Sequence, residues 1–191
     1  MLDFALGGNG RWLEPQMQIV AGMSERDMHV VFDSNSPEGI RGRILETMDR
    51  SGGYATFAYH PVVVGNYPRE PFGSCILTKP SVRPSSLKSA NALEFLITLQ
   101  RAYKGRHVRS ALIAHSLGVA ARHNVDVIFG AVDFANTGMD SFCRKIRAID
   151  GAHIRYAPDM RMGTNVIIIP TDEEVREQFK EKLKGTIYRH K

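Results

Sequence analysis

The segment from residue 92 to residue 132 constrains the fold of this chain more than any other. Residues 92–100 form a long apolar run that predicts a strand, and residues 110–123 have the apolar spacing of a helix. Residues 125–132 predict a second, buried strand. A basic turn that contains a glycine connects the first strand to the helix. A strand that leads through such a turn into a helix directs free backbone N–H groups at a phosphate, so this order predicts a nucleotide-cofactor site.

The turn also supplies cations for such a phosphate. Lys104, Arg106, His107 and Arg109 lie close together around Gly105. Cations gain nothing from the dipole at a helix N-terminus, so their presence there indicates another purpose. Charged hydrogen bonds to a phosphate provide one. A solvated basic loop is the alternative interpretation of the same residues.

Composition limits the class of protein. The chain has 191 residues, of which 43% are hydrophobic, enough to bury a core without a metal or a disulfide. Cys75 and Cys143 form no C-x-x-C pair and stand far apart, which fits a reducing compartment. No apolar run approaches the roughly 20 residues that a membrane span needs, and residues 1–4 lack the basic start of a signal peptide. We therefore expect a soluble, cytoplasmic protein. Its formal net charge of +5 favours an acidic partner.

The remaining segments predict further strands and helices. Residues 1–16 are rich in glycine and end near Pro15, so we expect an N-terminal arm, followed by a single domain over residues 17–191. Ser24 and Pro37 are typical first residues of helices and predict two of them. Periodicity and composition predict strands over 17–21, 54–59, 72–77, 153–156 and 165–169, and helices over 138–147 and 173–184.

The basic turn, together with Asn136 and the segment 139–145, resembles the GNAT superfamily of N-acyltransferases. In that family the turn reads Gln/Arg-x-x-Gly-x-Gly/Ala and holds the pyrophosphate of acyl-coenzyme A. Here Lys104 takes the first place, and His107 and Arg109 stand where the glycines are expected. The resemblance implies an α/β protein with the GNAT fold: a mixed central sheet of about seven strands with helices on both faces, in the order β-α-α-β-β-β-α-β-α-β-β.

The resemblance also implies how the cofactor binds. In GNAT proteins the two central strands separate, the pantetheine arm pairs with the open edge of the first strand, and a backbone N–H polarises the thioester oxygen. Leu99 is the residue at that place. An ordinary parallel sheet without a gap is the alternative. The implied cofactor contacts are Leu99, Gln100, Arg101, Lys104, Gly105, Arg106, His107, Val108, Arg109, Ser110, Asn136 and Phe142.

Two side chains are candidates for proton transfer. Cys143 stands where the family commonly has a tyrosine that protonates the departing thiolate, and a thiol with a pKa of about 8.5 is a feasible acid for that step. Packing in the core is the alternative role for this cysteine. Glu94 lies where several family members have a general base that acts through water, on the face of the strand opposite to Phe95. It faces either the cleft or solvent.

Three functions are compatible with these residues. The first is an N-acyltransferase that uses acetyl-coenzyme A, or another acyl-coenzyme A, on an amine of a small molecule or a protein, as a monomer or homodimer and without a metal. The second is a GNAT-fold binding or structural protein, for instance from a phage, that no longer catalyses. His107 and Arg109 favour the second because they replace glycines, whereas Lys104, Gly105 and Asn136 favour the first. The third is a nucleic-acid-associated relative, which the basic charge suggests.

Overall fold

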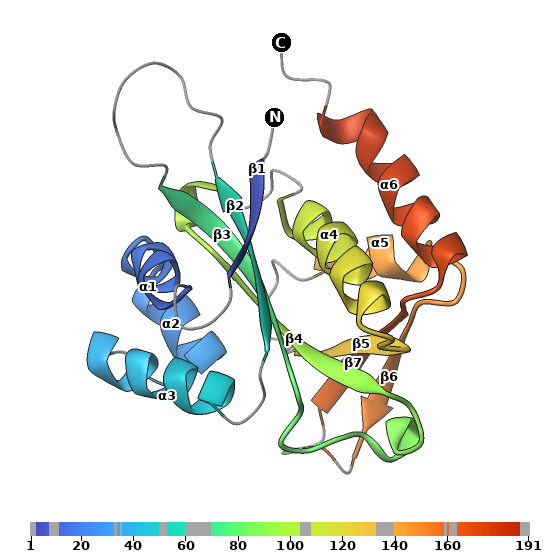
Figure 1. Ribbon diagram of the computed structural model, residues 1–191, viewed down its shortest axis with the longest axis horizontal. Coiled ribbons are helices and arrows are strands. Elements are labelled where there is room, and N and C mark those ends of the chain that lie inside the picture. Colours follow the sequence, from blue (N-terminus) through green and yellow to red (C-terminus); the bar gives the residue numbers. More distant parts are fainter. Residues whose placement is uncertain are drawn as a thin grey trace. The chain divides into compact units, whose positions relative to one another are not determined.

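The computed structural model describes residues 3–7, 12–32, 34, 36–49, 53–59, 70–103, 108–132, 140–158, 160 and 164–187. Two short 3-10 helices, η1 (Ser85–Leu87) and η2 (Arg101–Tyr103), precede and follow the fourth strand. Figure 1 shows the other elements, which are in chain order β1 (Asp3–Gly7), α1 (Leu13–Ala21), α2 (Glu25–Phe32), α3 (Pro37–Asp49), β2 (Tyr54–Tyr59), β3 (Pro71–Thr78), β4 (Ala92–Leu99), α4 (Val108–Arg122), β5 (Val127–Val132), α5 (Asp140–Arg147), β6 (His153–Ala157), β7 (Thr164–Pro170) and α6 (Glu173–Ile187).

The strands form one seven-stranded sheet in the order β1-β2-β3-β4-β5-β7-β6. β4 and β5 are parallel, while β1–β2, β2–β3, β5–β7 and β6–β7 are antiparallel pairs. The mixed sheet of about seven strands that the sequence predicts is therefore confirmed.

The chain consists of two compact units. Unit 1 comprises Met1–Thr78 and Leu96–Leu112, and unit 2 comprises Lys79–Phe95 and Ile113–Lys191. Two of the boundaries between the units, after Phe95 and after Leu112, each fall inside a helix or strand. The second half of β4 and the beginning of α4 belong to unit 1, and the remainder of each belongs to unit 2.

In unit 1, the helices α1, α2 and α3 pack on one face of the strands (Figure 1). Ile40 and Ile44 of α3 are one helical turn apart, and both are buried. Ile19 and Val20 of α1 and Phe57 of β2 are buried as well. Burial of these apolar side chains drives the layers together. The core cluster consists of Trp12, Leu13, Ile19, Val20, Phe32, Ile40, Ile44, Ala55, Phe57 and Ile76.

In unit 2, a cluster of buried apolar residues lies around the pairing of β5 with β7 and of β7 with β6. Asp172 begins α6, because its Oδ1 accepts the backbone N–H of Val175 at 2.9 Å and so caps a helical N–H that lacks a helical acceptor. The N–H of Asp150 donates to Gln178 Oε1 at 2.9 Å, which fastens α6 to the turn after α5. The core cluster consists of Leu87, Ala92, Phe129, Ala157, Val166 and Ile168.

Two predictions for the first residues are wrong. Residues 3–7, expected in an arm, form β1 and pair with β2 along their whole length. Residues 17–21, expected as a strand, belong to α1, which begins at Leu13. Pro15 does not end an arm. It occupies the first turn of α1, where the N–H that proline lacks would have no helical acceptor anyway.

The other predicted helices and strands are confirmed, with their ends shifted by a few residues.

Within the part of the chain that the structure describes, no helix is long and apolar enough to cross a membrane.

Candidate functional site

The pairing of β4 with β5 stops halfway along β4. Ala92, Leu93 and Glu94 pair with Val127, Ile128 and Phe129, and this is the whole of the β4–β5 register although both strands are described to their ends. The second half of β4, Leu96–Leu99, lies in unit 1, where β4 is the neighbour of β3. Within unit 1, the other edge of this half-strand has no strand partner among the described residues.

Leu99 directs its backbone N–H out of that edge. The N–H of Gln100 donates to the carbonyl oxygen of Phe72 at 3.0 Å, so the Gln100 N–H faces β3. Neighbouring residues of an extended strand direct their N–H groups to opposite edges. The N–H of Leu99 therefore points away from β3, as the predicted role of this residue requires.

A glycine on β3 brings the end of β4 and the start of α4 together. A Cβ added to Gly73 would lie 2.5 Å from Leu99 Cδ2, 3.3 Å from Leu112 Cδ1 and 3.4 Å from Val108 Cγ1. Any larger residue would displace at least one of these buried side chains. Gly73 is thus required for the close packing of both segments. Local sequence does not indicate this role, because the contacts come from distant positions.

The first turn of α4 presents backbone N–H groups at the start of the helix. Val108 and Ser110 are buried, while Arg109 is half-buried. Because α4 begins at Val108, the first N–H groups of the helix have no acceptor within it. The residues of the basic turn that precede this helix, Lys104, Gly105, Arg106 and His107, lie outside the described residues.

Side chains before the turn are anchored on β3. The ring of Tyr103 in η2 stacks on Phe72, with centroids 4.3 Å apart and planes at 28°. Gln100 Nε2 donates to the carbonyl oxygen of Pro71 at 3.2 Å, whereas Arg101 is exposed. The end of β4 therefore reaches the turn in a defined position.

In unit 2, Glu94 is a partly buried carboxylate. Burial raises the pKa of Glu94 above its ordinary value, because removal from water disfavours the charged form. Leu93 and Phe95 are buried on the opposite face of the strand, and Phe95 lies against Gly130, whose added Cβ would be 2.5 Å from Phe95 Cε2. A carboxylate of raised pKa is a stronger base than an exposed one.

The helix α5 carries the other candidates of unit 2. Phe142 and Cys143 are 5% and 2% exposed, so both side chains lie in the interior of this unit. Neither Cys75 nor Cys143 forms a disulfide. Asn136 lies outside the described residues.

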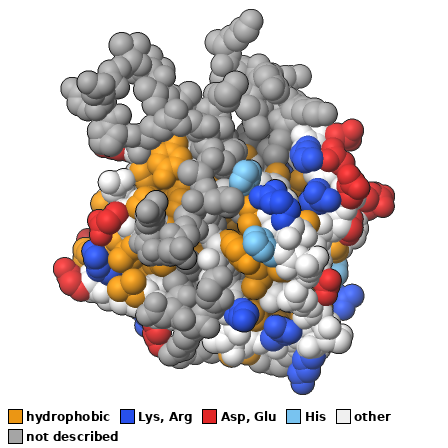
Figure 2. All heavy atoms as spheres, viewed as in Figure 1, with side chains coloured by type: hydrophobic (Ala, Val, Ile, Leu, Met, Phe, Trp, Pro, Cys, Tyr) orange, Lys and Arg blue, Asp and Glu red, His pale blue; other side chains and the backbone are white. Residues whose placement is uncertain are grey.

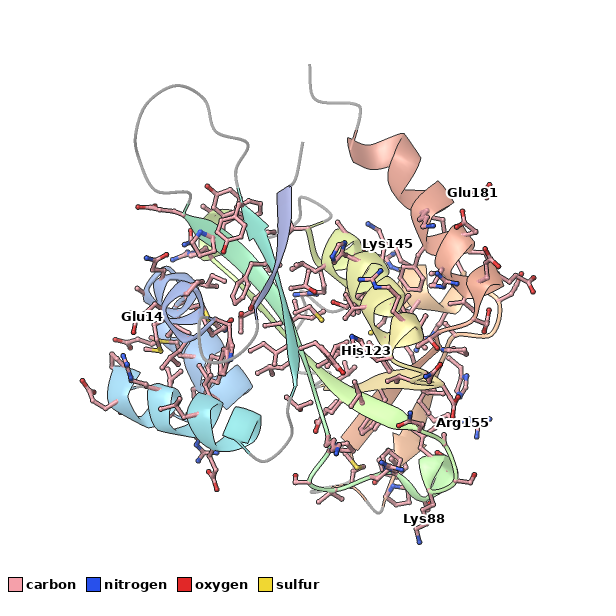
Figure 3. All side chains as sticks on the ribbon, in the orientation of Figure 1. Glu14, Lys88, His123, Lys145, Arg155 and Glu181 are labelled. Carbon is pink, nitrogen blue, oxygen red and sulfur yellow. The ribbon has the colours of Figure 1, made fainter. Side chains whose placement is uncertain are left out.

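Basic side chains gather on one face of unit 2. Figure 2 shows Lys, Arg and His side chains close together over α4 and α5, and Figure 3 labels two of them, His123 and Lys145. Burial lowers the pKa of Lys145, and burial followed by repulsion from Arg122 lowers the pKa of His115. Each of these two side chains therefore loses its proton more easily than an exposed residue of the same type.

No family model matches the sequence, and no curated protein matches it. Solved structures are similar to it nonetheless. The GNAT domain of PAT from S. lividans has a TM-score of 0.63 at 15% identity, covering 88% of this chain and 90% of its own. An acetyltransferase of the GNAT family from Staphylococcus aureus Mu50 has a TM-score of 0.59 at 12% identity, covering 89% and 100%. An N-acetyltransferase from the same strain has a TM-score of 0.55 at 13% identity, covering 89% and 99%.

The chain has the GNAT fold. The predicted fold class is thereby confirmed. In unit 1, the structure brings together six of the predicted cofactor contacts, namely Leu99, Gln100, Arg101, Val108, Arg109 and Ser110. Glu94, Phe142 and Cys143 belong to unit 2. Sequence reasoning missed three residues of unit 1 that contact the end of β4 or the residues just after it, namely Gly73, Gln16 and Gly22.

Proposed function

We propose that this protein is an acyl-coenzyme A dependent N-acyltransferase, with acetyl-coenzyme A as donor and an amine as acceptor. One observation carries the proposal: among the described residues of unit 1, the edge of β4 at Leu96–Leu99 has no strand partner, and the Leu99 N–H points out of it. An unpaired strand edge can bind an extended chain that carries amide groups, and the pantetheine arm is such a chain. The names of the similar acetyltransferases support acetyl transfer to nitrogen.

Unit 1 would hold the whole donor. The amides of pantetheine would pair with β4, and the Leu99 N–H would donate to the thioester oxygen, on which negative charge develops. The backbone N–H groups in the first turn of α4, at Val108, Arg109 and Ser110, would receive the pyrophosphate. Lys104, Arg106 and Arg109 would add charged hydrogen bonds to the phosphates.

The chemistry then requires two proton transfers. The amine nitrogen attacks the thioester carbonyl carbon, a C–N bond forms, and the C–S bond breaks. We assign Glu94 as the base that takes the amine proton through water, since burial raises the pKa of its carboxyl. We assign the Cys143 thiol as the acid that returns a proton to the coenzyme A thiolate.

The donor assignment is tested by binding. Acetyl-coenzyme A should raise the melting temperature of the native protein, because a ligand that binds only the folded state stabilises it. Lys104→Ala with Arg106→Ala should weaken binding in calorimetry by about 1–3 kcal/mol, as expected when charged hydrogen bonds are lost. The matched control is Lys88→Ala with Arg155→Ala, two cations that Figure 3 shows at the periphery of unit 2. Equal affinity of both double variants would refute the assignment.

Activity is tested separately from binding. Release of thiol from acetyl-coenzyme A is followed with a panel of amines: an amino acid, a polyamine and a lysine-containing peptide. Tight donor binding with no transfer to any amine would favour the second function, a GNAT-fold protein that binds without catalysing.

His107 and Arg109 provide a direct test between these two functions. If they mark a degraded site, His107→Gly with Arg109→Gly should gain affinity for acetyl-coenzyme A, because the backbone can then approach the phosphate. If they are adapted to hold the donor, the same variant should lose affinity together with its charges. Calorimetry distinguishes a gain from a loss.

A further inference from the structure

Three buried polar side chains from three elements of unit 1 form a closed ring. Gln16 Nε2 of α1 donates to Thr98 Oγ1 of β4 at 2.9 Å, and Ser74 Oγ of β3 donates to Gln16 Oε1 at 2.5 Å. The hydroxyls of Ser74 and Thr98 are 2.6 Å apart. Because the Ser74 proton already points to Gln16, the Thr98 hydroxyl must donate to Ser74. Each member therefore donates once and accepts once around the ring.

The ring lies in a dry environment. Gln16, Ser74 and Thr98 are 0%, 0% and 1% exposed, and the neighbouring residues Ile19 and Ile76 belong to the apolar core of unit 1. Apolar residues of the same shape would serve stability equally well at such a place. What hydrogen bonds add is direction, because the ring closes in only one relative placement of α1, β3 and β4.

The residues that follow Thr98 are held by α1 and β3, the same elements that carry Gln16 and Ser74. The N–H of Arg101 donates to the carbonyl oxygen of Gly22 at the end of α1, at 3.1 Å. Gln100 packs against that glycine, since a Cβ on Gly22 would lie 2.7 Å from Gln100 Cγ. Its amide donates to Pro71 of β3 at 3.2 Å. Leu99 is thus held on both sides, by Thr98 before it and Gln100 after it.

We propose that Gln16, Ser74 and Thr98 are positioning residues for acyl transfer, which hold the end of β4 so that the Leu99 N–H keeps its direction toward the thioester oxygen. This inference rests on the proposed function, because only a donor site gives that N–H a reacting oxygen. Thr98 precedes Leu99, so any shift of the Thr98 backbone moves the Leu99 N–H with it. A misplacement of about 1 Å at such a donor can lower a rate on the order of 100-fold.

The test removes the ring without leaving a buried polar group unpaired. The triple variant Gln16→Leu, Ser74→Ala, Thr98→Val replaces every member by an apolar residue, and its melting temperature should stay near the native value. The matched control is Thr98→Ser, which keeps the hydroxyl. For each protein we would measure the melting temperature, the acetyl-coenzyme A affinity, the rate of thiol release with the amine panel, and the response of the Leu99 amide NMR signal to acetyl-coenzyme A.

The proposal expects a separation of rate from binding. The triple variant should bind acetyl-coenzyme A with little loss, because the phosphates bind elsewhere, but release thiol at least about tenfold more slowly. Its Leu99 amide signal should lose the shift that the native protein shows on binding. Thr98→Ser should match the native rate. A purely structural role would change the melting temperature and leave the rate and the amide signal unaltered.

The failures are distinguishable. A native protein that neither binds acetyl-coenzyme A nor releases thiol overturns the proposed function and the positioning role together. A native protein that is active, with a triple variant equally active, overturns the positioning role alone. If the triple variant does not fold, Thr98→Val and Thr98→Ser decide the matter: equal rates at a temperature where both are folded overturn the role, and a slow Thr98→Val supports it.

Discussion

At the scale of single residues, the two proposed proton-transfer groups differ in their surroundings. Glu94 is partly buried, and loss of water raises the pKa of its carboxyl. Cys143 is 2% exposed in α5, so its thiol has almost no contact with solvent. Each group can therefore be tested for a catalytic role against a simpler structural one.

Glu94→Gln should stabilise the protein at neutral pH. A carboxyl whose pKa is higher in the folded state than in the unfolded state lowers stability as pH rises through the interval between those values. The amide removes that loss, so the gain in melting temperature should be complete at neutral pH and absent below the ordinary glutamate pKa. Melting curves across pH check this. The same variant should transfer acetyl groups more slowly if Glu94 is the base, whereas an unchanged rate would leave it a structural carboxylate.

Cys143→Ala should lower turnover by at least about tenfold without changing acetyl-coenzyme A affinity, as expected for loss of a general acid. Cys143→Ser is the comparison, because a hydroxyl keeps a proton donor in nearly the same volume. Steady-state kinetics and calorimetry provide the two readings. If Cys143→Ala has a lower melting temperature, as expected for a small cavity, but a normal turnover rate, the thiol has only a packing role.

At the scale of elements, β3 supports the end of β4 and the start of α4 more than its sequence indicates. Its residues 73 and 74 face different neighbours: Gly73 gives room to Leu99 and Val108, and Ser74 joins the ring with Gln16. β3 therefore determines where β4 ends and where α4 begins.

Gly73→Ala should destabilise the protein by about 1–3 kcal/mol, because the new methyl group overpacks the contact with Leu99. Affinity for acetyl-coenzyme A should fall as well, since Val108 and the first turn of α4 move. The control is Gly42→Ala on the exposed face of α3, where nothing lies within 4 Å of an added Cβ. That variant should gain about 0.5–1 kcal/mol from helix propensity. Denaturant unfolding of both variants tests the contrast, and equal effects would contradict it.

At the scale of the whole molecule, positive charge should assist donor binding. The chain carries a formal net charge of +5, and coenzyme A is an anion. A field of this sign attracts the donor over a range that salt shortens. Cations on α4 and α5 contribute to the field in addition to those of the basic turn (Figure 2).

Affinity for acetyl-coenzyme A should therefore fall steadily as sodium chloride is raised. S-acetylpantetheine lacks the nucleotide phosphates, so its affinity for the strand edge should hardly respond to salt. Calorimetry of both ligands at several salt concentrations tests this. Equal salt dependence of the two ligands would show that phosphate contacts do not contribute.

Local pattern by itself determined most elements of this protein. The helix α3 and the strands β2 and β3 follow from spacing and from helix-start and turn residues, because these effects act between residues near in sequence. The segment 17–21 shows where this ends. Its short apolar run fits a strand or a helix equally, and packing of α1 on β3 selected the helix.

Only the tertiary structure decided how the end of β4 is supported. Gln16, Ser74 and Thr98 carry no common motif, and their hydrogen bonds join positions 24 to 82 residues apart. Gly73 likewise acquires its role from Leu99, Val108 and Leu112. The physical reason is that burial and hydrogen bonding depend on which surfaces pack together. The local sequence indicates which face of an element is apolar, but not which other element packs against it.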